Sequence, residues 1–243
     1  MNLQTPSTVS PSIVLNDLCL GFRLGRNQEK ILFEQINGKA YPGELVALIG
    51  ANGRGKSTLL RCLCGLGAPL RGSLSLDQND VAYVPSHTPR TRHFAVVDLL
   101  ATACYHRSDW LGNIGTAEEE KIRQALEQVG LSGFEYRDTA ELSDGEFQRV
   151  TLAAALVKGS SIIVLDEPTA FLDIANKMVI TELLKNLAYQ QQKTIVFSTH
   201  DLQPALKSCD RIWLMGYDGF YDKRGPEAPL DKLFQDFSIS TFF

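Results

Sequence analysis

Short apolar runs alternate along the chain with longer segments in which apolar residues recur every three or four positions. The runs have the length of buried strands, and the longer segments have the period of amphipathic helices. A chain that alternates strands and helices is typical of a mostly parallel sheet with helices on both faces, so an α/β fold is predicted. The expected strands are 45–49, 73–76, 81–84, 161–165, 194–198 and 211–215, and the expected helices are 55–64, 143–157, 174–189 and 202–208.

Four regions depart from this alternation. Two strands, at 13–20 and 31–36, come before the first long helix and predict an antiparallel layer beside the parallel core. Two amphipathic segments between 95 and 133 predict an inserted helical lobe, which reaches to about residue 158. Residues 1–12, rich in Ser, Thr and Pro, predict a disordered leader. A tail at 226–243 suits one amphipathic helix through its spacing of Leu230, Leu233, Phe234 and Phe237.

Composition limits the classes of partner. With 243 residues and 44% hydrophobic content, the chain suffices for a well-buried core, and one domain over 13–243 is expected. The net charge of −4 gives no excess of basic side chains for nucleic-acid phosphates. No apolar stretch approaches the roughly 20 residues that cross a bilayer, and the N-terminus lacks the pattern of a secretion signal. A cytosolic protein is therefore predicted.

Five cysteines show no CxxC spacing and form an odd set. Cys62 and Cys64 lie two apart on a predicted helix and so point in different directions, which disfavours a shared metal. We interpret the cysteines as small apolar residues in a reducing compartment. They are Cys19, Cys62, Cys64, Cys104 and Cys209.

The sequence GANGRGKS, at 50–57, lies between the strand at 45–49 and a leucine-rich helix. Backbone N–H groups of such a loop, together with the helix N-terminus, bind a triphosphate. Lys56 would reach the β- and γ-phosphates, and Ser57 would bind the bridging Mg²⁺. A simple glycine turn is the alternative, but a turn has no need of a Lys-Ser pair. The predicted nucleotide contacts of this loop are Gly50, Asn52, Gly53, Gly55, Lys56, Ser57 and Thr58.

Two acidic residues, Asp166 and Glu167, end the apolar run IIVLDE. A buried parallel strand tolerates charge only at its end, where ligands bind in such sheets. Neighbouring side chains on a strand point to opposite sides, so the two acids are given different tasks. Asp166 is expected to hold Mg²⁺, and Glu167 to take a proton from the attacking water. The alternative is that both only solvate the strand end.

A helix is predicted to begin within LSDGEFQ, at 142–148. Ser143 and Glu146 have the spacing of a capping box, which any helix could use. A cap does not require Gly145, which costs helix stability of about 1 kcal/mol relative to Ala. We interpret this first turn as bare, with N–H groups free for an external phosphate.

His200 follows the strand at 194–198. A lone histidine there is more often a structural residue than a catalytic one. Because the two neighbouring strand ends carry the glycine loop and the acids, we predict that His200 contacts the γ-phosphate.

Together these segments resemble the nucleotide-binding subunit of the ATP-binding cassette (ABC) family, over about residues 13–221. In that family's terms, 50–57 resembles the Walker A loop, 142–148 the signature motif and 162–167 the Walker B strand. Residues 169–173 resemble the D-loop, and 198–201 the switch-histidine loop. The resemblance implies an ATPase with ATP and Mg²⁺ as cofactors and Glu167, His200 and Lys56 as catalytic residues. It also implies a head-to-tail homodimer in the ATP-bound state, in which Ser143, Gly145 and Asp173 contact the partner's ATP, while Phe22 stacks on adenine.

The chain departs from the family pattern at two places. The signature carries Asp144 and Glu146 where the family commonly has Gly and Gln. Ser86 follows the strand at 81–84 where the family usually has Gln, and its hydroxyl is several atoms shorter than a Gln amide. Ser86 is therefore the weakest of the candidate Mg²⁺ contacts, and a water or His87 could take its place. We hypothesise altered coupling between nucleotide and partner at this loop.

Soluble ABC proteins usually carry two cassettes or long coiled coils, so a subunit docked on an integral membrane permease, at the cytoplasmic face of the membrane, is the leading hypothesis. The stretch 97–112 is similar to the helical lobe of importers for iron-siderophores, haem and cobalamin, although Ala103-Cys104 replaces an expected Gly-Arg pair. A substrate-binding protein is expected in the complex, and residues 85–95 are expected to line the permease groove. The alternatives are a soluble assembly ATPase, such as one in iron-sulfur cluster formation, and a P-loop kinase, which the signature and His200 disfavour.

Overall fold

The computed structural model describes residues 9–25, 28–103 and 115–225. The expectations for the tail at 226–243, for most of the leader and for residues 104–112 of the importer-like stretch, Cys104 included, lie outside these ranges. Ser12 is already part of the folded chain, because its N–H donates to Ala40 O at 2.8 Å and its hydroxyl accepts a hydrogen bond from Thr194. The described structure therefore starts slightly before the predicted first strand.

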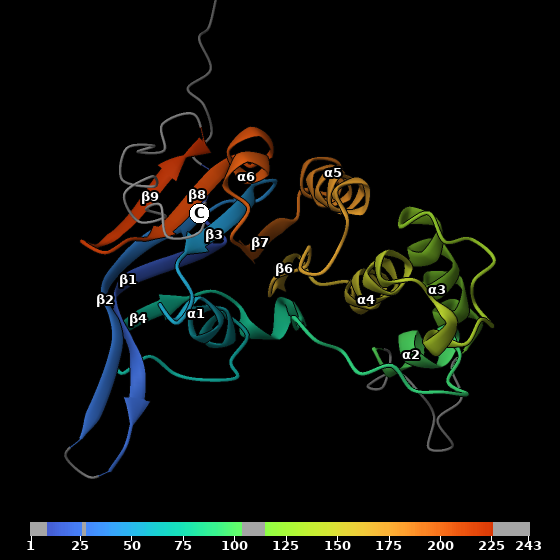
Figure 1. Cartoon of the computed structure of the whole chain (residues 1–243), viewed down its shortest axis with the longest axis horizontal. Coiled ribbons are helices and arrows are strands. Elements are labelled where there is room, and N and C mark those ends of the chain that lie inside the picture. The colour runs from blue at the N-terminus through green and yellow to red at the C-terminus, as the bar shows by residue number, and fades with distance from the viewer. Residues whose placement is uncertain (1–8, 26–27, 104–114, 226–243) are drawn as a thin grey trace, which may run out of the picture.

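A small antiparallel sheet forms the outer layer. It contains β1 (Ile13–Arg23), β2 (Glu29–Ala40) and β4 (Arg71–Ser75), in the order β2-β1-β4. The predicted layer of two strands thus gains a third, which the sequence indicated as a strand without indicating its partner. β1 and β2 extend as a long hairpin beyond the body of the molecule (Figure 1).

The main sheet has six strands in the order β5-β6-β7-β3-β8-β9. The first five are parallel to their neighbours, and β9 pairs antiparallel with β8 at the edge. The mostly parallel core of the prediction is confirmed. The strands are β3 (Leu45–Gly50), β5 (Val81–Val84), β6 (Ile162–Leu165), β7 (Thr194–Thr199), β8 (Arg211–Met215) and β9 (Phe220–Arg224).

Both faces of the main sheet are buried. On β3, Val46 and Leu48 face a core that includes α1 (Lys56–Leu63) and the antiparallel sheet, whereas Leu45, Ala47 and Ile49 face a second core. This alternation follows from the two-residue period of a strand and explains why β3 is apolar throughout. The helices whose side chains enter the second core include α4 (Asp144–Lys158), α5 (Ile174–Gln191) and α6 (Leu202–Ser208).

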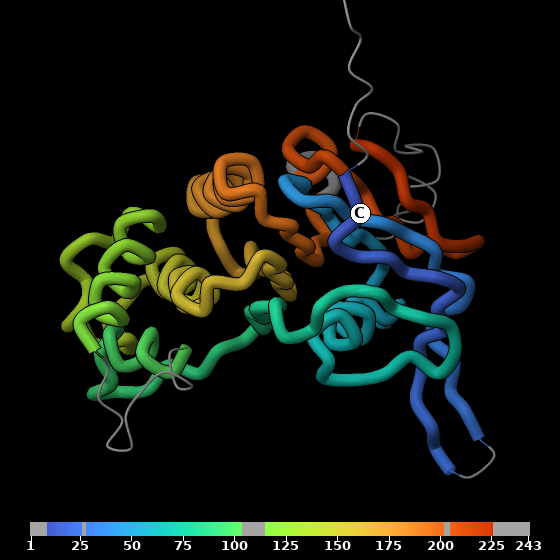
Figure 2. Tube along the Cα trace, turned by 180° about the vertical axis from the view of Figure 1, so that it is seen from behind, coloured from blue at the N-terminus to red at the C-terminus, as the bar shows by residue number. Residues whose placement is uncertain are grey.

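The helical lobe lies to one side of the two sheets (Figures 1 and 2). It is built by α2 (Val96–Thr102) and α3 (Thr116–Gln128), which pack on α4, and all three helices lie between β5 and β6 in the chain. Short 3₁₀ turns at Gln78–Asp80 and Thr139–Glu141 complete the helical elements named here. Buried residues of the lobe belong to the same continuous core as the main sheet, so α4 joins the two parts.

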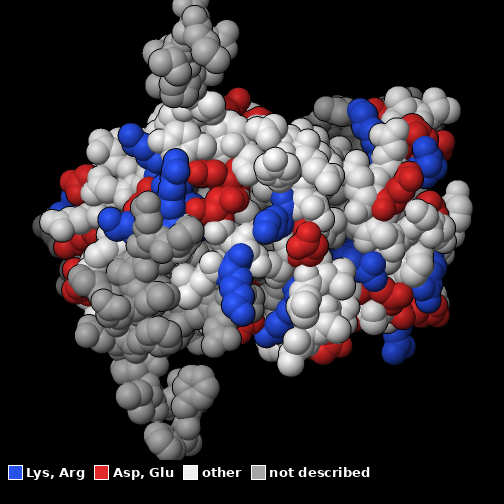
Figure 3. All heavy atoms as spheres, turned by 90° about the horizontal axis from the view of Figure 1, so that it is seen from above, with Lys and Arg blue, Asp and Glu red and all other residues white. Residues whose placement is uncertain are grey.

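Positive and negative side chains are interspersed on the face of the molecule that Figure 3 shows. Within the described ranges, no helix has the length and apolar character needed to cross a membrane. The described cysteines are free thiols, and burial raises the pKa of Cys64 and of Cys209 to about 12. A thiol with a raised pKa stays neutral, which agrees with the interpretation of these residues as apolar.

Arg211 ties the start of β8 to the turn before β3 and to β9. Its guanidinium donates to both carboxylate oxygens of Glu44, at 2.8 and 3.0 Å, and to Asp222 Oδ1 on β9 at 2.9 Å. The Arg211 side chain is 10% exposed, and its pKa is raised, chiefly by the hydrogen bonds to Glu44. The two carboxylates are nearly buried as well, so each depends on this one guanidinium for its compensating charge.

We expect Arg211→Ala to lower the free energy of unfolding by about 3 kcal/mol, because Glu44 and Asp222 lose their partner while largely out of water. Urea unfolding followed by circular dichroism measures the change. Arg224→Ala is the matched control, since Arg224 pairs with Arg211 across β8 and β9 but is exposed. Equal unfolding midpoints for the two variants would contradict the role given to Arg211.

Candidate nucleotide-binding site

Three parallel strands end side by side at one edge of the main sheet. β7 lies between β6 and β3, with Leu165 opposite Phe197 and Ile49 opposite Thr199. The structure therefore brings together the glycine loop after β3, the acids after β6 and His200 after β7. The carboxyl edge of a parallel sheet is where ligands bind in such folds.

The glycine loop is held open by two left-handed glycines, Gly53 at φ +79° and Gly55 at φ +100°. Lys56 opens α1 and is only 6% exposed. Its Nζ donates to the loop's own carbonyls, Gly50 O at 2.7 Å and Ala51 O at 3.2 Å. Burial lowers the pKa of Lys56, and the nearby carboxylates Glu167 and Asp166 oppose this shift. A desolvated ammonium held by neutral carbonyls gains from an anion, so the loop fits a triphosphate.

Asp166 and Glu167 are linked through Ser198, which the sequence analysis gave no role. Ser198 Oγ donates to Asp166 Oδ1 at 2.7 Å and accepts from the Glu167 backbone N–H at 2.8 Å. Ser198 is fully buried and Asp166 is 6% exposed. One hydroxyl therefore holds both the Asp166 carboxylate and the backbone of Glu167. The available signal was the place of Ser198 at the end of a buried strand, where a hydroxyl needs a partner.

Glu167 has a left-handed backbone, with φ +51°. This conformation is strained for a residue with a side chain and is often found at functional sites. Glu167 Oε2 lies 3.3 Å from His200 Nε2, so the carboxylate and the imidazole converge. The predicted base and the predicted γ-phosphate contact are thus neighbours at the same strand edge.

The remaining predicted contacts of the same subunit are distributed around this edge. Asn52 and Ser57 are exposed, and Thr58 is half-buried in α1. Phe22 is 51% exposed and lies on β1 of the antiparallel sheet, so its ring is available for stacking. Ser86 is exposed in the loop after β5.

The signature segment has the predicted capping box. Ser143 caps α4, with its N–H donating to Glu146 Oε2 at 2.8 Å and its Oγ accepting from Glu146 N at 3.3 Å. The expectation of a bare first turn therefore needs correction, because the Glu146 N–H is already used. Those of Asp144 and Gly145 still lack an intrahelical partner.

Gly145 has a packing role that its sequence did not indicate. It is buried, and a Cβ built on it would lie 2.4 Å from Asn176 Oδ1. Asn176 in turn donates to Asp173, the N-cap of α5, from its side-chain Nδ2 to Oδ2 at 3.1 Å and from its backbone N–H to Oδ1 at 2.7 Å. Asp173 and Gly145, both predicted to contact the partner's ATP, are thus joined through one side chain within the same chain.

Comparison with known proteins decides the family. The model of the ABC transporter family matches residues 33–170, which include the glycine loop, the signature and the Walker B strand. The chain belongs to the ABC transporter family. The family resemblance and the fold class predicted from the sequence are thereby confirmed, and this ABC protein is an ATPase that binds ATP.

Relatives of this ABC ATPase include two transport proteins. The petrobactin import ATP-binding protein FpuD of Bacillus anthracis is 33% identical, over 86% of this chain and 81% of that protein. The zinc transport system ATP-binding protein TroB of Treponema pallidum (strain Nichols) is 34% identical, over 86% of this chain and 80% of that protein. Among solved structures, a metal-chelate type ABC transporter in an inward-facing conformation matches with a TM-score of 0.85 at 26% identity, covering 94% of this chain and 89% of that chain.

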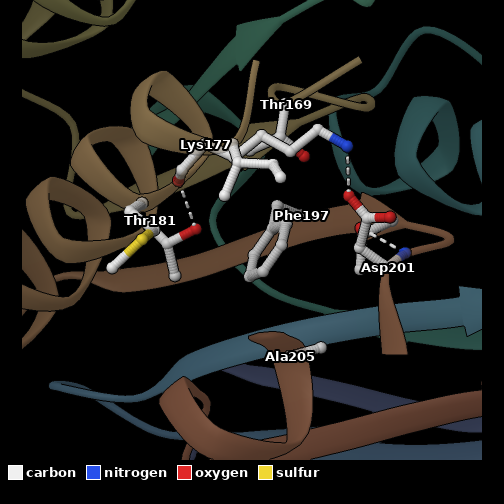
Figure 4. Close-up of a pocket in the computed structure, with 9 residues that line it drawn as sticks. Thr169, Lys177, Thr181, Phe197, Asp201 and Ala205 are labelled. Atoms are coloured by element: carbon white, nitrogen blue, oxygen red, sulfur yellow. Dashed lines mark hydrogen bonds and ion pairs between the residues drawn. The ribbon is translucent and has the colours of Figure 1, made fainter. Parts of the chain in front are cut away.

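A cavity of about 230 Å³ lies beside the nucleotide site of this ABC ATPase, between α5, β7 and α6. Phe197 lines it, and the ion pair of Lys177 Nζ with Asp201 Oδ2, at 2.7 Å, crosses one side (Figure 4). Neither Lys56 nor Glu167 lines this cavity, so it is distinct from the phosphate site. The Lys177 pair instead joins α5 to the loop that carries His200.

The residues present fit Mg²⁺ by their chemistry. Ser57 offers a hydroxyl and Asp166 a carboxylate, the oxygen donors that Mg²⁺ prefers, and phosphate oxygens and waters complete such sites. Asp166 is held by Ser198, which restrains its carboxylate before any ligand arrives. Ser57 and Asp166 would hold the ion, and the ion would neutralise phosphate charge when bound.

We expect Ser198→Ala to lower kcat for ATP hydrolysis roughly tenfold with a smaller change in KM, because Ser198 orients the acids and supplies no phosphate contact. The Glu167 N–H would also lose its acceptor, at about 1–3 kcal/mol of stability. Steady-state phosphate release and thermal unfolding measure the two effects.

Ser161→Ala is the matched control for Ser198→Ala. Ser161 also donates its hydroxyl to an aspartate, Asp80, but at the opposite end of β6. The control should keep its kcat. If Ser198→Ala and Ser161→Ala turn over ATP at the same rate, Ser198 does not organise the site.

Proposed function

We propose that this chain is the ATP-hydrolysing subunit that powers import of a metal chelate through a separate membrane permease. The main support for this proposal is that four side chains meet at one edge of the sheet in a chain of the ABC family. They are Lys56, Asp166, Glu167 and His200. Similarity to a petrobactin import protein and to a metal-chelate type transporter supports a metal chelate as the cargo. The sequence predicts a cargo of the iron-siderophore, haem or cobalamin type.

In the proposed mechanism, Lys56 leaves the carbonyls of Gly50 and Ala51 and binds the β- and γ-phosphates. Glu167 then takes a proton from the water that attacks the γ-phosphate. His200 lies against the Glu167 carboxylate and would hold both that carboxylate and the γ-phosphate in place. The proton moves from water to Glu167, and the bond between the β,γ-bridging oxygen and the γ-phosphorus breaks.

The site is completed by a second subunit in this proposal. Ser143 begins α4 in the helical lobe, whereas Lys56 begins α1 between the two sheets (Figures 1 and 2). A head-to-tail homodimer would place Ser143, Gly145 and Asp173 of one copy against the ATP held by the other. The D-loop and α5 expose large apolar side chains, with Phe171 94% exposed and Ile174 and Met178 also outward, which is typical of a surface that a partner covers.

A permease would dock on the groove that runs along β5, the loop after it, α2 and α4. This groove holds a cavity of about 190 Å³, lined by side chains that include Tyr83, Pro85, Thr88, Leu99 and Ala103. A mostly apolar groove suits the apolar face of a short helix from a membrane protein. Docking there places the chain at the cytoplasmic face of the membrane, with a substrate-binding protein delivering cargo from the other side.

We expect Glu167→Gln to abolish ATP hydrolysis and to accumulate an ATP-bound dimer, because the amide cannot accept the proton of the attacking water. Sedimentation with ATP and Mg²⁺ measures the dimer, and phosphate release measures the activity. Asp80→Asn is a control, since it changes a carboxylate at the opposite end of β6 from Glu167. A Glu167→Gln variant that hydrolyses ATP at the normal rate would remove Glu167 as the base.

We expect Thr88→Glu to reduce co-purification of a multi-span permease several-fold, because a charge in the groove must be desolvated on docking. Thr102→Glu is the matched control, because Thr102 is exposed on α2 and does not line the groove. Intrinsic ATPase activity should survive both changes. A tagged wild-type chain that brings down no multi-span membrane protein would favour the soluble assembly ATPase instead.

A further inference from the structure

Arg90, in the loop between β5 and α2, makes three contacts with the signature segment. Its Nη1 donates to Leu142 O at 2.8 Å, and its Nη2 donates a charged hydrogen bond to the Asp144 carboxylate. The guanidinium also lies 4.7 Å from the centre of the Phe147 ring. These contacts bracket Ser143 on both sides.

The signature segment of this chain carries an unusual charge for its proposed task. Asp144 and Glu146 flank Gly145, and two carboxylates favour a helix N-terminus but repel an approaching phosphate. Hydrogen bonds from Ser143 lower the pKa of Glu146, so that carboxylate stays ionised at neutral pH. Each acid has its own arginine: Arg90 binds Asp144, and Arg137 Nη1 lies 3.6 Å from Glu146 Oε1.

The loop that carries Arg90 is itself fastened to the segment before α4. The His93 N–H donates to Asp138 Oδ2 at 2.7 Å, and Thr139 Oγ1 donates to Thr91 O at 3.0 Å. Arg90 is therefore held in place by its neighbours as well as by its own contacts, and its side chain is only 30% exposed. A charge fixed in this way compensates Asp144 without further loss of side-chain entropy on ATP binding.

Building on the two-subunit site proposed above, we propose that Arg90 is a positioning residue of the signature segment. It cancels the charge of Asp144 beside Ser143, so that Ser143 can approach the partner's triphosphate, and its contacts with Leu142 and Phe147 hold the guanidinium where it can do so. Asp144 and Arg90 thus form one unit, in which the acid at the position of the family's glycine is tolerated because the arginine neutralises it.

The test uses the full chain with Glu167→Gln as parent, and measures its monomer–dimer dissociation constant with ATP and Mg²⁺. Arg90→Gln should raise that constant roughly tenfold. Added salt should reduce the difference between the dissociation constants of Arg90→Gln and of the parent, because salt screens the charge of Asp144. Adding Asp144→Gly to Arg90→Gln should restore dimerisation to within about threefold of the parent. Affinity of the monomer for ATP should not change, because the glycine loop is untouched.

Two controls separate charge from general damage. Arg90→Lys keeps the charge and should weaken dimerisation less than Arg90→Gln does. Arg92→Gln removes an exposed arginine from the same loop. In the described structure, Arg92 makes no hydrogen bond or ion pair with residues 142–147, so the dissociation constant of Arg92→Gln should match that of the parent. If Arg90→Gln alone does not fold, Arg90→Gln with Asp144→Gly is compared with Asp144→Gly, and the two should dimerise equally.

Distinct outcomes would overturn the inference. An Arg90→Gln variant that dimerises like the parent, or one that Asp144→Gly fails to rescue, contradicts the pairing of charges. A tenfold gap between the double variant and Asp144→Gly also contradicts it. A parent that stays monomeric with ATP contradicts the proposed two-subunit site itself, and this inference with it.

Discussion

Parallel hydrogen bonding of β6, β7 and β3 is the constraint on which the site depends. With β7 in the middle, the glycine loop after Gly50, the acids after Leu165 and the histidine after Thr199 emerge at one edge. The same pairing buries every residue of these strands, so polar groups enter the structure mainly at the strand ends. Packing and chemistry are thus separated along each strand, and the loops carry the function.

Polar groups at this edge are restrained before any ligand binds. Ser198 joins Asp166 to the backbone of Glu167, and His200 lies against the Glu167 carboxylate. The Lys56 ammonium donates to a carbonyl of its own loop and is largely removed from water, which lowers its pKa. A site in which two carboxylates are already oriented, and in which only the Lys56 ammonium must turn, loses little conformational freedom when a triphosphate arrives. The strained backbone of Glu167 fits this arrangement, because the surrounding hydrogen bonds hold it.

Periodicity predicted the described helices and strands well, because buried parallel strands and amphipathic helices have distinct patterns. It could not assign β4 to the antiparallel sheet, since a short strand carries no sign of its partner. The glycine loop and the acids were identifiable because glycines followed by Lys-Ser indicate phosphate binding, and carboxylates at the end of a buried strand indicate a ligand site. Ser198, Arg90 and Asn176 were not, because their roles arise from contacts between distant segments. The expectation of a bare turn at the signature was wrong for a local reason. The Glu146 carboxylate accepts from the Ser143 N–H, and the Glu146 N–H donates to the Ser143 hydroxyl.

In the proposed dimer, one subunit supplies the phosphate loop and the acid while the other supplies the signature. Mixing two inactive variants, Lys56→Ala and Ser143→Arg, distinguishes such a shared site from a site within one subunit. In a shared site, a mixed dimer holds one intact pocket, so ATP hydrolysis should return to roughly a quarter of the wild-type rate at equal mixing. A mixture as inactive as either variant alone, although the chains do exchange, would contradict the account.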